Sequence, residues 1–210
     1  MGGQPHENFC NRLRNDPKQV YVVAEAGLNH GGNKERALAL LRAAKWTGAD
    51  AVKFQTLPAT PAPGKGQSAS PEWRKSMDLS SDMFRAISKE ADRIGIDLLS
   101  TSIDKESADL FDGLGVHGFE IGPGHLTNRS LIEHVSGKRK PVLLSTGLST
   151  VEDIAKAIEW IRAQSNDQVV LLHGIPSDPA KHAELNLSSV QFLRDRFSVP
   201  VGYSDYSSGT

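Results

Sequence analysis

The chain has only one cysteine, Cys10, so no disulfide can form within it, which is typical of a protein in a reducing compartment. Its formal net charge of -1 excludes the strongly basic surface that binding to nucleic acid or to anionic membranes usually requires. No apolar run is long enough to cross a bilayer, and no charged segment followed by an apolar one opens the chain. We therefore expect a cytoplasmic protein with no nucleic-acid partner and no membrane partner.

The 210 residues are 38% hydrophobic and 23% charged, which is ordinary for a globular domain with a substantial core. Seven short apolar runs alternate with segments of helical periodicity. The runs are almost continuously hydrophobic, as expected of parallel strands that are covered on both faces. The predicted strands are Val20–Ala24, Ala51–Phe54, Ile96–Leu99, Gly118–Ile121, Pro141–Leu144, Val169–Leu172 and Val199–Tyr203.

Apolar residues spaced at i, i+3, i+4 and i+7 predict helices between these strands. The predicted helices are Lys34–Trp46, Ser81–Arg93, Val151–Ala163 and Asn186–Arg196. Asn186 is a plausible N-cap for the last of them. Gly48, Gly95 and Gly115 follow helices, and glycine at such joints predicts a left-handed C-terminal cap before the chain enters a strand.

About seven β-α steps without a reversal favour a (β/α)₈ TIM barrel, with an open doubly wound sheet as the alternative. A complete barrel has eight strands and typically ~250 residues, so we expect an incomplete one. Residues 1–18 are interpreted as a polar N-terminal leader, and residues 19–210 as the barrel domain without its C-terminal part. The irregular segment Leu57–Ser80 is either a lid over the barrel mouth or an insertion without a role.

Polar side chains stand at the ends of the predicted strands, where barrels collect their functional groups. Glu25 ends the first strand, and Lys53 and Gln55 end the second. Lysine and hydroxyl groups suit a phosphate or carboxylate ligand, and Glu25 could act in acid–base chemistry. A purely structural pairing of Lys53 with Glu25 or Glu120 is the alternative. The hydroxyl residues at the other strand ends include Thr101, Ser145 and Ser204.

The histidines indicate a functional site less strongly than these strand-end residues do. His173 follows an apolar run and is interpreted as a buried histidine that hydrogen-bonds to the backbone. His30 and His125 lie in predicted loops, and we expect both to be surface residues.

Seven segments in order resemble the catalytic barrel of the sialic acid synthase family, which includes N-acetylneuraminate synthase and its bacterial relatives for legionaminic and pseudaminic acids. The segments are AEAGLNHGG, GADAVKFQT, LLSTSID, FEIGPGHLTN, PVLLSTGLST, VVLLHG and VPVGYSDYSSG. The resemblance covers roughly residues 20–210. It implies condensation of phosphoenolpyruvate with an N-acyl hexosamine, such as N-acetylmannosamine, to a nonulosonic acid. It also implies a divalent metal, Mn²⁺ or Mg²⁺, and a homodimer whose C-terminal antifreeze-like domain is absent from this sequence.

The resemblance also implies roles for individual residues. Glu25 would be catalytic, close to the metal and the reacting carbons, and Gln55 would lie near the sugar. The phosphoenolpyruvate contacts would come from Lys53 and Thr101, with Ser145 and Ser204 holding phosphate or carboxylate oxygens.

Several positions depart from the family pattern. Glu120, Pro123 and His125 replace a lysine, a serine and an acidic residue after the fourth strand, and Tyr206 replaces a metal-binding histidine. Pro176 and Asp178 likewise alter the segment after the sixth strand. An opposite-charge pair at ~4 Å contributes ~4 kcal/mol at an effective dielectric constant of ~20, so exchanging lysine for glutamate should weaken anion binding severely. Two alternatives to a synthase therefore stay open: a catalytically impaired sugar- or anion-binding barrel, and another barrel aldolase.

Overall fold

The computed structural model describes residues 20–55, 70–77 and 79–208, together with Phe9, Cys10 and Leu13. The predicted leader and most of the predicted lid segment lie outside the described residues. The chain forms two compact units: Tyr21–His117, here called the β1–β3 unit, and Gly118–Thr210 with Met1–Val20, here called the β4–β7 unit.

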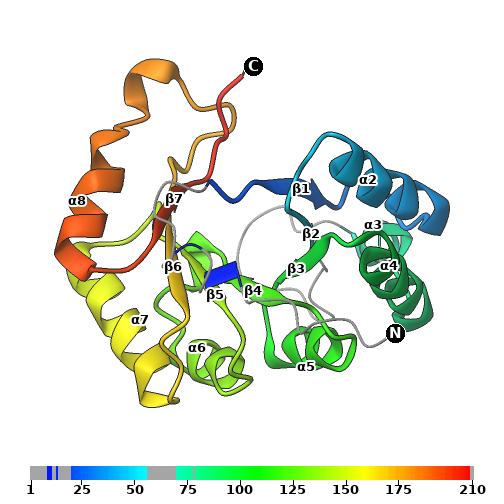
Figure 1. Ribbon diagram of the computed structural model, residues 1–210, viewed down its shortest axis with the longest axis horizontal. Helices are drawn as coiled ribbons and strands as arrows, with labels where there is room; N and C mark the ends of the chain where they lie inside the picture. Colours follow the sequence, from blue (N-terminus) through cyan, green and yellow to red (C-terminus); the bar gives the residue numbers. More distant parts are fainter. Residues whose placement is uncertain (1–8, 11–12, 14–19, 56–69, 78, 209–210) are drawn as a thin grey trace. The chain divides into compact units, whose positions relative to one another are not determined.

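The β1–β3 unit contains three parallel strands connected by helices (Figure 1). Residue Glu25 of β1 lies opposite Lys53 of β2, and Gln55 of β2 lies opposite Thr101 of β3. In chain order its elements are β1 (Val23–Gly27), α2 (Lys34–Trp46), β2 (Ala51–Gln55), α3 (Pro71–Met77), α4 (Ser81–Ile94), β3 (Asp97–Thr101) and α5 (Lys105–Gly113).

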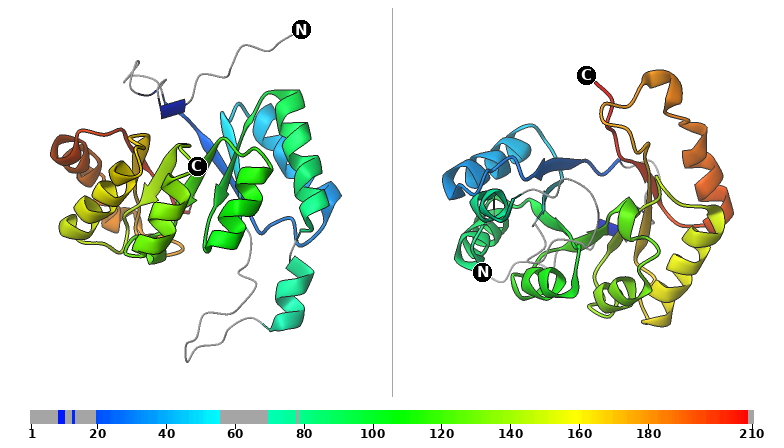
Figure 2. Two further views of the ribbon diagram at one scale, coloured as in Figure 1. Left: turned by 90° about the horizontal axis from the view of Figure 1, so that it is seen from below. Right: turned by 180° about the vertical axis from the view of Figure 1, so that it is seen from behind.

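The β4–β7 unit repeats this arrangement with four parallel strands. Helices α6, α7 and α8 lie along one side of its strands in both Figure 1 and Figure 2. Its elements are β4 (Gly118–Ile121), η1 (Pro123–His125), α6 (Arg129–Ser136), β5 (Val142–Ser145), α7 (Val151–Ala163), β6 (Val169–His173), η2 (His182–Glu184), α8 (Ser188–Phe197) and β7 (Val201–Tyr203).

The strands follow one another in chain order, and every described strand pair is parallel. An open doubly wound sheet reverses its strand order, so the predicted α/β fold with seven units of a (β/α)₈ barrel is confirmed. The first strand begins at Val23 and not at Val20, and Val20 and Val22 are exposed. The other strand positions agree with the apolar runs to within two residues.

Helix ends account for one success and one error of the sequence predictions. Gly48, Gly95 and Gly115 have φ angles of 88°, 68° and 79°, which confirms the left-handed conformation predicted after their helices. Asn186 is not the N-cap of α8, which begins at Ser188. Its own φ is 47°, and its carbonyl accepts a hydrogen bond from Ser189 N at 2.8 Å, so its backbone forms a turn before the helix.

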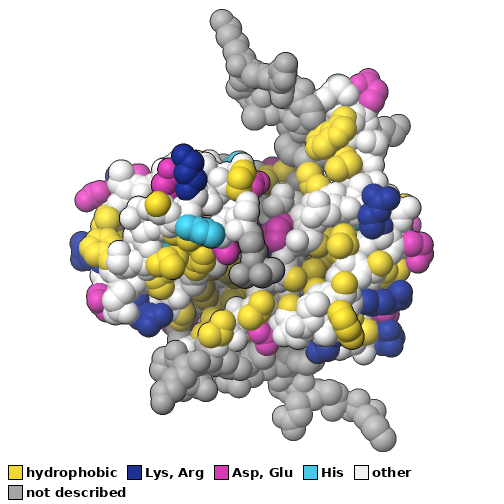
Figure 3. Space-filling model, turned by 90° about the horizontal axis from the view of Figure 1, so that it is seen from above, with side chains coloured by type: hydrophobic (Ala, Val, Ile, Leu, Met, Phe, Trp, Pro, Cys, Tyr) yellow, Lys and Arg dark blue, Asp and Glu magenta, His cyan; other side chains and the backbone are white. Residues whose placement is uncertain are grey.

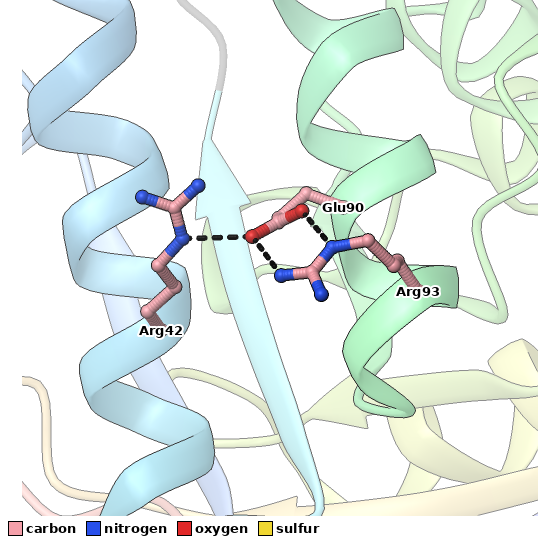
Figure 4. Close-up of polar contacts among 3 residues, drawn as sticks. All are labelled: Arg42, Glu90 and Arg93. Atoms are coloured by element: carbon pink, nitrogen blue, oxygen red, sulfur yellow. Dashed lines mark hydrogen bonds and ion pairs between the residues drawn. The ribbon is translucent and has the colours of Figure 1, made fainter.

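An ionic cluster joins α2 to α4 on the surface of the β1–β3 unit (Figure 4). The guanidinium of Arg42 in α2 donates from Nε to Glu90 Oε1 at 2.7 Å. Arg93, one turn beyond Glu90 in α4, donates to both carboxylate oxygens at 2.6 and 2.8 Å. These hydrogen bonds, first from Arg93 and then from Arg42, lower the pKa of Glu90 to about 2.

Among the described residues, the face shown in Figure 3 carries both positive side chains (Lys and Arg) and negative ones (Asp and Glu). Among the helices described, none combines the length and the apolar character needed to cross a membrane.

We predict that Glu90→Gln lowers the thermal unfolding midpoint at pH 7 by a few degrees. The depressed pKa of Glu90 means that its contribution to stability is present above the ordinary carboxyl pKa of 4.5 and is lost as the pH falls towards about 2. The difference between wild type and variant, followed by circular dichroism, should therefore shrink across this window. Asp82→Asn is the matched control because its pair with Arg85 lies within α4, and Asp82 is 90% exposed. Equal midpoints for wild type and Glu90→Gln at pH 7 would contradict the prediction.

Candidate active site

A carboxylate and an ammonium group meet at the carboxyl ends of β1 and β2. Glu25 and Lys53 are direct partners in the parallel register, and Lys53 Nζ lies 2.8 Å from Glu25 Oε2. The Lys53 side chain is only 10% exposed, whereas that of Glu25 is 47% exposed. Because a buried ammonium is costly without a counter-charge, Glu25 compensates Lys53 while keeping one side open to solvent.

A bulge at the end of β1 makes room for the Glu25 carboxylate. The register with β2 shifts between Glu25 and Gly27, and Gly27 has a φ of 49°. A Cβ at Gly27 would stand 2.8 Å from Glu25 Oε1, closer than real contacts allow. Glycine suits this position because its backbone is left-handed, and any side chain here would displace the Glu25 carboxylate.

Gln55 and Thr101 extend this group of side chains. Gln55 Nε2 donates to Glu25 Oε1 at 3.4 Å, a long hydrogen bond. Thr101 lies opposite Gln55 in the register and is buried. Side chains at parallel partner positions point to the same face, so Glu25, Lys53, Gln55 and Thr101 form one cluster, here called the strand-end cluster. The structure thus brings together all four predicted residues of this unit, and their functional roles remain predictions.

His30, in the loop after β1, is not the surface residue that we expected. It is 1% exposed, its Nδ1 accepts a hydrogen bond from Gly32 N at 3.1 Å, and its ring centroid lies 6.0 Å from that of Phe54. The tight turn through Gly31 and Gly32, both with positive φ, folds the loop back over the imidazole. The loop composition concealed this burial, because glycine and asparagine are also typical of exposed turns.

The β4–β7 unit has a pocket of about 120 Å³ at the carboxyl ends of its strands. Two predicted ligand-binding residues, Ser145 and Ser204, both line it, as does Tyr206. The full lining is Pro123, Ser145, Gly147, Leu172, Gly174, Ile175, Pro176, Ser177, Asp178, Ser204 and Tyr206.

Behind the pocket, the hydroxyl of Ser145 donates to Glu120 Oε1 at 2.7 Å, and both residues are 4% exposed. Glu120 lies on β4 opposite Leu143, two residues before Ser145 on β5, so the two side chains share one face of the sheet. A hydroxyl has a single proton. While Ser145 gives that proton to Glu120, it offers only lone pairs to a ligand. Sequence reasoning identified both residues but not this bond.

Close backbone approaches shape the pocket wall. A Cβ at Gly147 would stand 2.7 Å from Gly174 O, so the loops after β5 and β6 can touch only through glycine. Ala180 N donates to Tyr206 O at 2.8 Å, which fastens the loop after β6 to the segment after β7. His173 is buried and its Nε2 lies 2.8 Å from Leu185 O, which confirms the predicted backbone-bonded histidine.

The segment that carries Tyr206 does not offer an open set of metal ligands. Asp205 Oδ1 accepts hydrogen bonds from Ser207 N at 2.8 Å and from the Tyr203 hydroxyl at 3.2 Å. The bond from the Ser207 backbone is the first cause of a lowered Asp205 pKa, while burial raises the pKa of Tyr203. Within the described residues, no three His, Cys, Asp or Glu side chains gather into a group that could hold an ion. The Mn²⁺ or Mg²⁺ expected from the sequence stays a prediction.

Seven ordered β-α units, with ionisable and hydroxyl side chains at the carboxyl ends of the strands, define this chain as a (β/α)₈-type protein with an enzyme-like site. Residues 40–210 match the NeuB family, and the chain belongs to that family.

Two named relatives are identical to this chain at about a third of the aligned positions. An N,N'-diacetyllegionaminic acid synthase from Legionella pneumophila is 34% identical over 93% of this chain, and the spore coat polysaccharide biosynthesis protein SpsE from Bacillus subtilis is 31% identical over 95%. The chain spans 60% and 56% of their respective lengths. Among solved structures, the N-acetylneuraminic acid synthetase from Leptospira borgpetersenii superposes with a TM-score of 0.83 at 28% identity, over 91% of this chain and 67% of that one.

We predict that Gly27→Ala destabilises the protein more than Gly48→Ala does. Both substitutions place a side chain at a positive φ, which costs ~1–2 kcal/mol, but a Cβ at Gly48 meets nothing within 4 Å. Only the change at Gly27 also displaces Glu25. Urea unfolding would measure the two free energies.

The double variant Glu25→Ala/Gly27→Ala isolates the contact with Glu25. In the Glu25→Ala background, Gly27→Ala should cost no more than Gly48→Ala. If the cost of Gly27→Ala is the same with and without Glu25, the carboxylate does not depend on this glycine.

Proposed function

We propose that this chain supplies the barrel of a nonulosonic acid synthase, which condenses phosphoenolpyruvate with an N-acyl hexosamine. The observation that carries the proposal is the strand-end cluster: Glu25, Lys53 and Gln55 meet through contacts of 2.8 and 3.4 Å at the ends of two neighbouring strands. The names of the relatives support it, since they include legionaminic, pseudaminic and N-acetylneuraminate-9-phosphate synthases.

In the proposed reaction, C3 of phosphoenolpyruvate attacks the aldehyde carbon of the open-chain sugar, and the aldehyde oxygen takes up a proton. Water adds at C2, the bond between C2 and the phosphate oxygen breaks, and inorganic phosphate leaves behind a 2-keto acid. Each turnover therefore consumes one water and releases one phosphate.

The strand-end cluster suits the charged end of this reaction. The Lys53 ammonium is a hydrogen-bond donor and carries the positive charge that the carboxylate or phosphate of phosphoenolpyruvate requires. The Glu25 side chain is 47% exposed, and a carboxylate that reaches solvent is able to orient water or accept a proton. Gln55 fixes the carboxylate from the other side and presents its amide oxygen to a sugar hydroxyl.

A second candidate function is a sugar-binding relative without turnover. It is favoured by the buried Glu120, which stands where the family pattern has a phosphoenolpyruvate lysine, and by Tyr206 in place of a metal-binding histidine. We also propose that the full-length protein is a homodimer and uses Mn²⁺ or Mg²⁺.

We predict that full-length protein releases phosphate from phosphoenolpyruvate only when N-acetylmannosamine or a related N-acyl hexosamine is present. Lys53→Met should lower kcat/KM by ~10²-fold or more, because it removes the charge that faces the anion. Glu25→Gln, which keeps the side-chain shape, should lower kcat more than it raises KM. Phosphate is measured with and without added Mn²⁺ and after treatment with a chelator.

Lys89→Met is the matched control. It makes the same change of side chain, but Lys89 lies on α4 and is not part of the strand-end cluster. It should leave the rate unchanged. A folded full-length protein that binds the sugar but releases no phosphate across several N-acyl hexosamines would support the second candidate and refute the first.

A further inference from the structure

The loop between β1 and α2 holds a histidine that the proposed reaction does not use. His30 is 1% exposed although it lies in a loop, and its Nδ1 accepts a hydrogen bond from the backbone N–H of Gly32 at 3.1 Å. Burying a polar ring costs free energy, so a loop that keeps one buried calls for a physical explanation.

The hydrogen bond from Gly32 fixes the state of the imidazole. A backbone N–H can only donate, so Nδ1 must present its lone pair, and the neutral ring then carries its proton on Nε2. The doubly protonated ring has a proton on Nδ1 and cannot accept this bond. The arrangement in the structure therefore belongs to one tautomer of the neutral imidazole.

Short backbone turns lie on both sides of His30. Before it, Asn29 N donates to Ala26 O at 3.0 Å. After it, Asn33 N donates to the His30 carbonyl, also at 3.0 Å. Gly32 lies between them at a φ of 68°, and glycine has the widest backbone freedom of any residue. By accepting from the N–H of Gly32, the imidazole restrains the part of the loop that is intrinsically most free to move.

The imidazole also packs beneath the bulge of β1. Its centroid lies 6.0 Å from that of Phe54, which is fully buried and is the register partner of Gly27. Successive side chains of a strand point to opposite faces, so Phe54 lies on the other face of β2 from Lys53. His30 thus anchors the loop at the level of Gly27, where the bulge makes room for the Glu25 carboxylate.

We propose that His30 is a positioning residue for Glu25. Its neutral imidazole accepts from Gly32, holds the loop after β1 against Phe54, and thereby keeps the bulge and the carboxylate in place. The ammonium of Lys53 belongs to β2, so the loop should govern the carboxylate more than the ammonium. The catalytic consequence rests on the proposed function, whereas the coupling between the imidazole and the carboxylate does not.

Two substitutions separate the acceptor from the ring. In His30→Asn the side-chain oxygen is bonded to Cγ, as Nδ1 is in histidine, so it can accept from Gly32. His30→Phe keeps an aromatic ring against Phe54 but has no acceptor.

Kinetics of the full-length protein test the role of the acceptor. His30→Phe should lower kcat by about tenfold or more, because a small displacement of a reacting group is costly, while KM for phosphoenolpyruvate stays within about twofold. His30→Asn should keep kcat within about threefold of the wild type, since it restores the acceptor.

Three NMR measurements need no turnover. Exchange of the Gly32 amide hydrogen should be about tenfold faster in His30→Phe than in the wild type and unchanged in His30→Asn. The carboxyl ¹³C resonance of Glu25 should move in His30→Phe and stay in place in His30→Asn. In the wild type, the ¹⁵N resonances of His30 should show an unprotonated Nδ1 and a protonated Nε2, a test that requires no variant to fold.

His134→Phe is the matched control, because it makes the same change in the last turn of α6 and not in the loop after β1. It should leave both kcat and the exchange of the Gly32 amide unchanged. Equal losses of kcat in His30→Asn and His30→Phe, a Gly32 amide that exchanges equally fast in all the proteins, or a protonated Nδ1 in the wild type would overturn the proposal.

The outcomes also distinguish this role from the proposed reaction. A wild type that releases no phosphate, although the Glu25 resonance depends on the acceptor at position 30, refutes the synthase and leaves the positioning of the carboxylate intact. Full turnover by His30→Phe does the reverse.

Discussion

The ion pair between Glu25 and Lys53 is the interaction on which the candidate site depends. A lysine with 10% of its side chain exposed requires a counter-charge, and the parallel register of β1 and β2 places Glu25 directly opposite it. The bulge at Gly27 then bends the end of β1 so that the carboxylate has space. Removing Glu25 takes a counter-charge away from a lysine that is only 10% exposed, whereas the half-exposed Glu25 stays in contact with water when Lys53 is removed.

The two units present chemically different strand ends. In the β1–β3 unit, an ammonium and a carboxylate stand beside an amide, which suits a charged ligand and proton transfer. In the β4–β7 unit, the pocket is lined by proline, leucine, isoleucine and hydroxyl groups, with Ser145 turned into an acceptor by Glu120.

The sequence predicted the fold well because the signals for it are local. Apolar runs and glycines after helices repeat through the chain, and each marks a boundary that short-range sterics determine, as at Gly95 and Gly115. Where a residue served an unexpected local purpose, the prediction failed. Asn186 uses its backbone in a turn and not its side chain as a cap.

The sequence predicted which residues belong to the candidate site, but not the contacts between them. Placing Glu25, Lys53 and Gln55 at strand ends follows from the alternation of strands and helices, but the burial of His30 and the bond from Ser145 to Glu120 depend on tertiary packing. Whether a hydroxyl donates or accepts depends on its partner. The partner of Ser145 is Glu120, 25 residues earlier in the chain, and no local sequence pattern identifies it.

A titration of the full-length protein with phosphoenolpyruvate, followed by ³¹P NMR, tests the role of the strand-end cluster most directly. If the cluster holds the anion, Lys53→Met abolishes binding while Lys89→Met leaves the affinity of the wild type unchanged. Persistence of phosphoenolpyruvate binding in Lys53→Met contradicts the account.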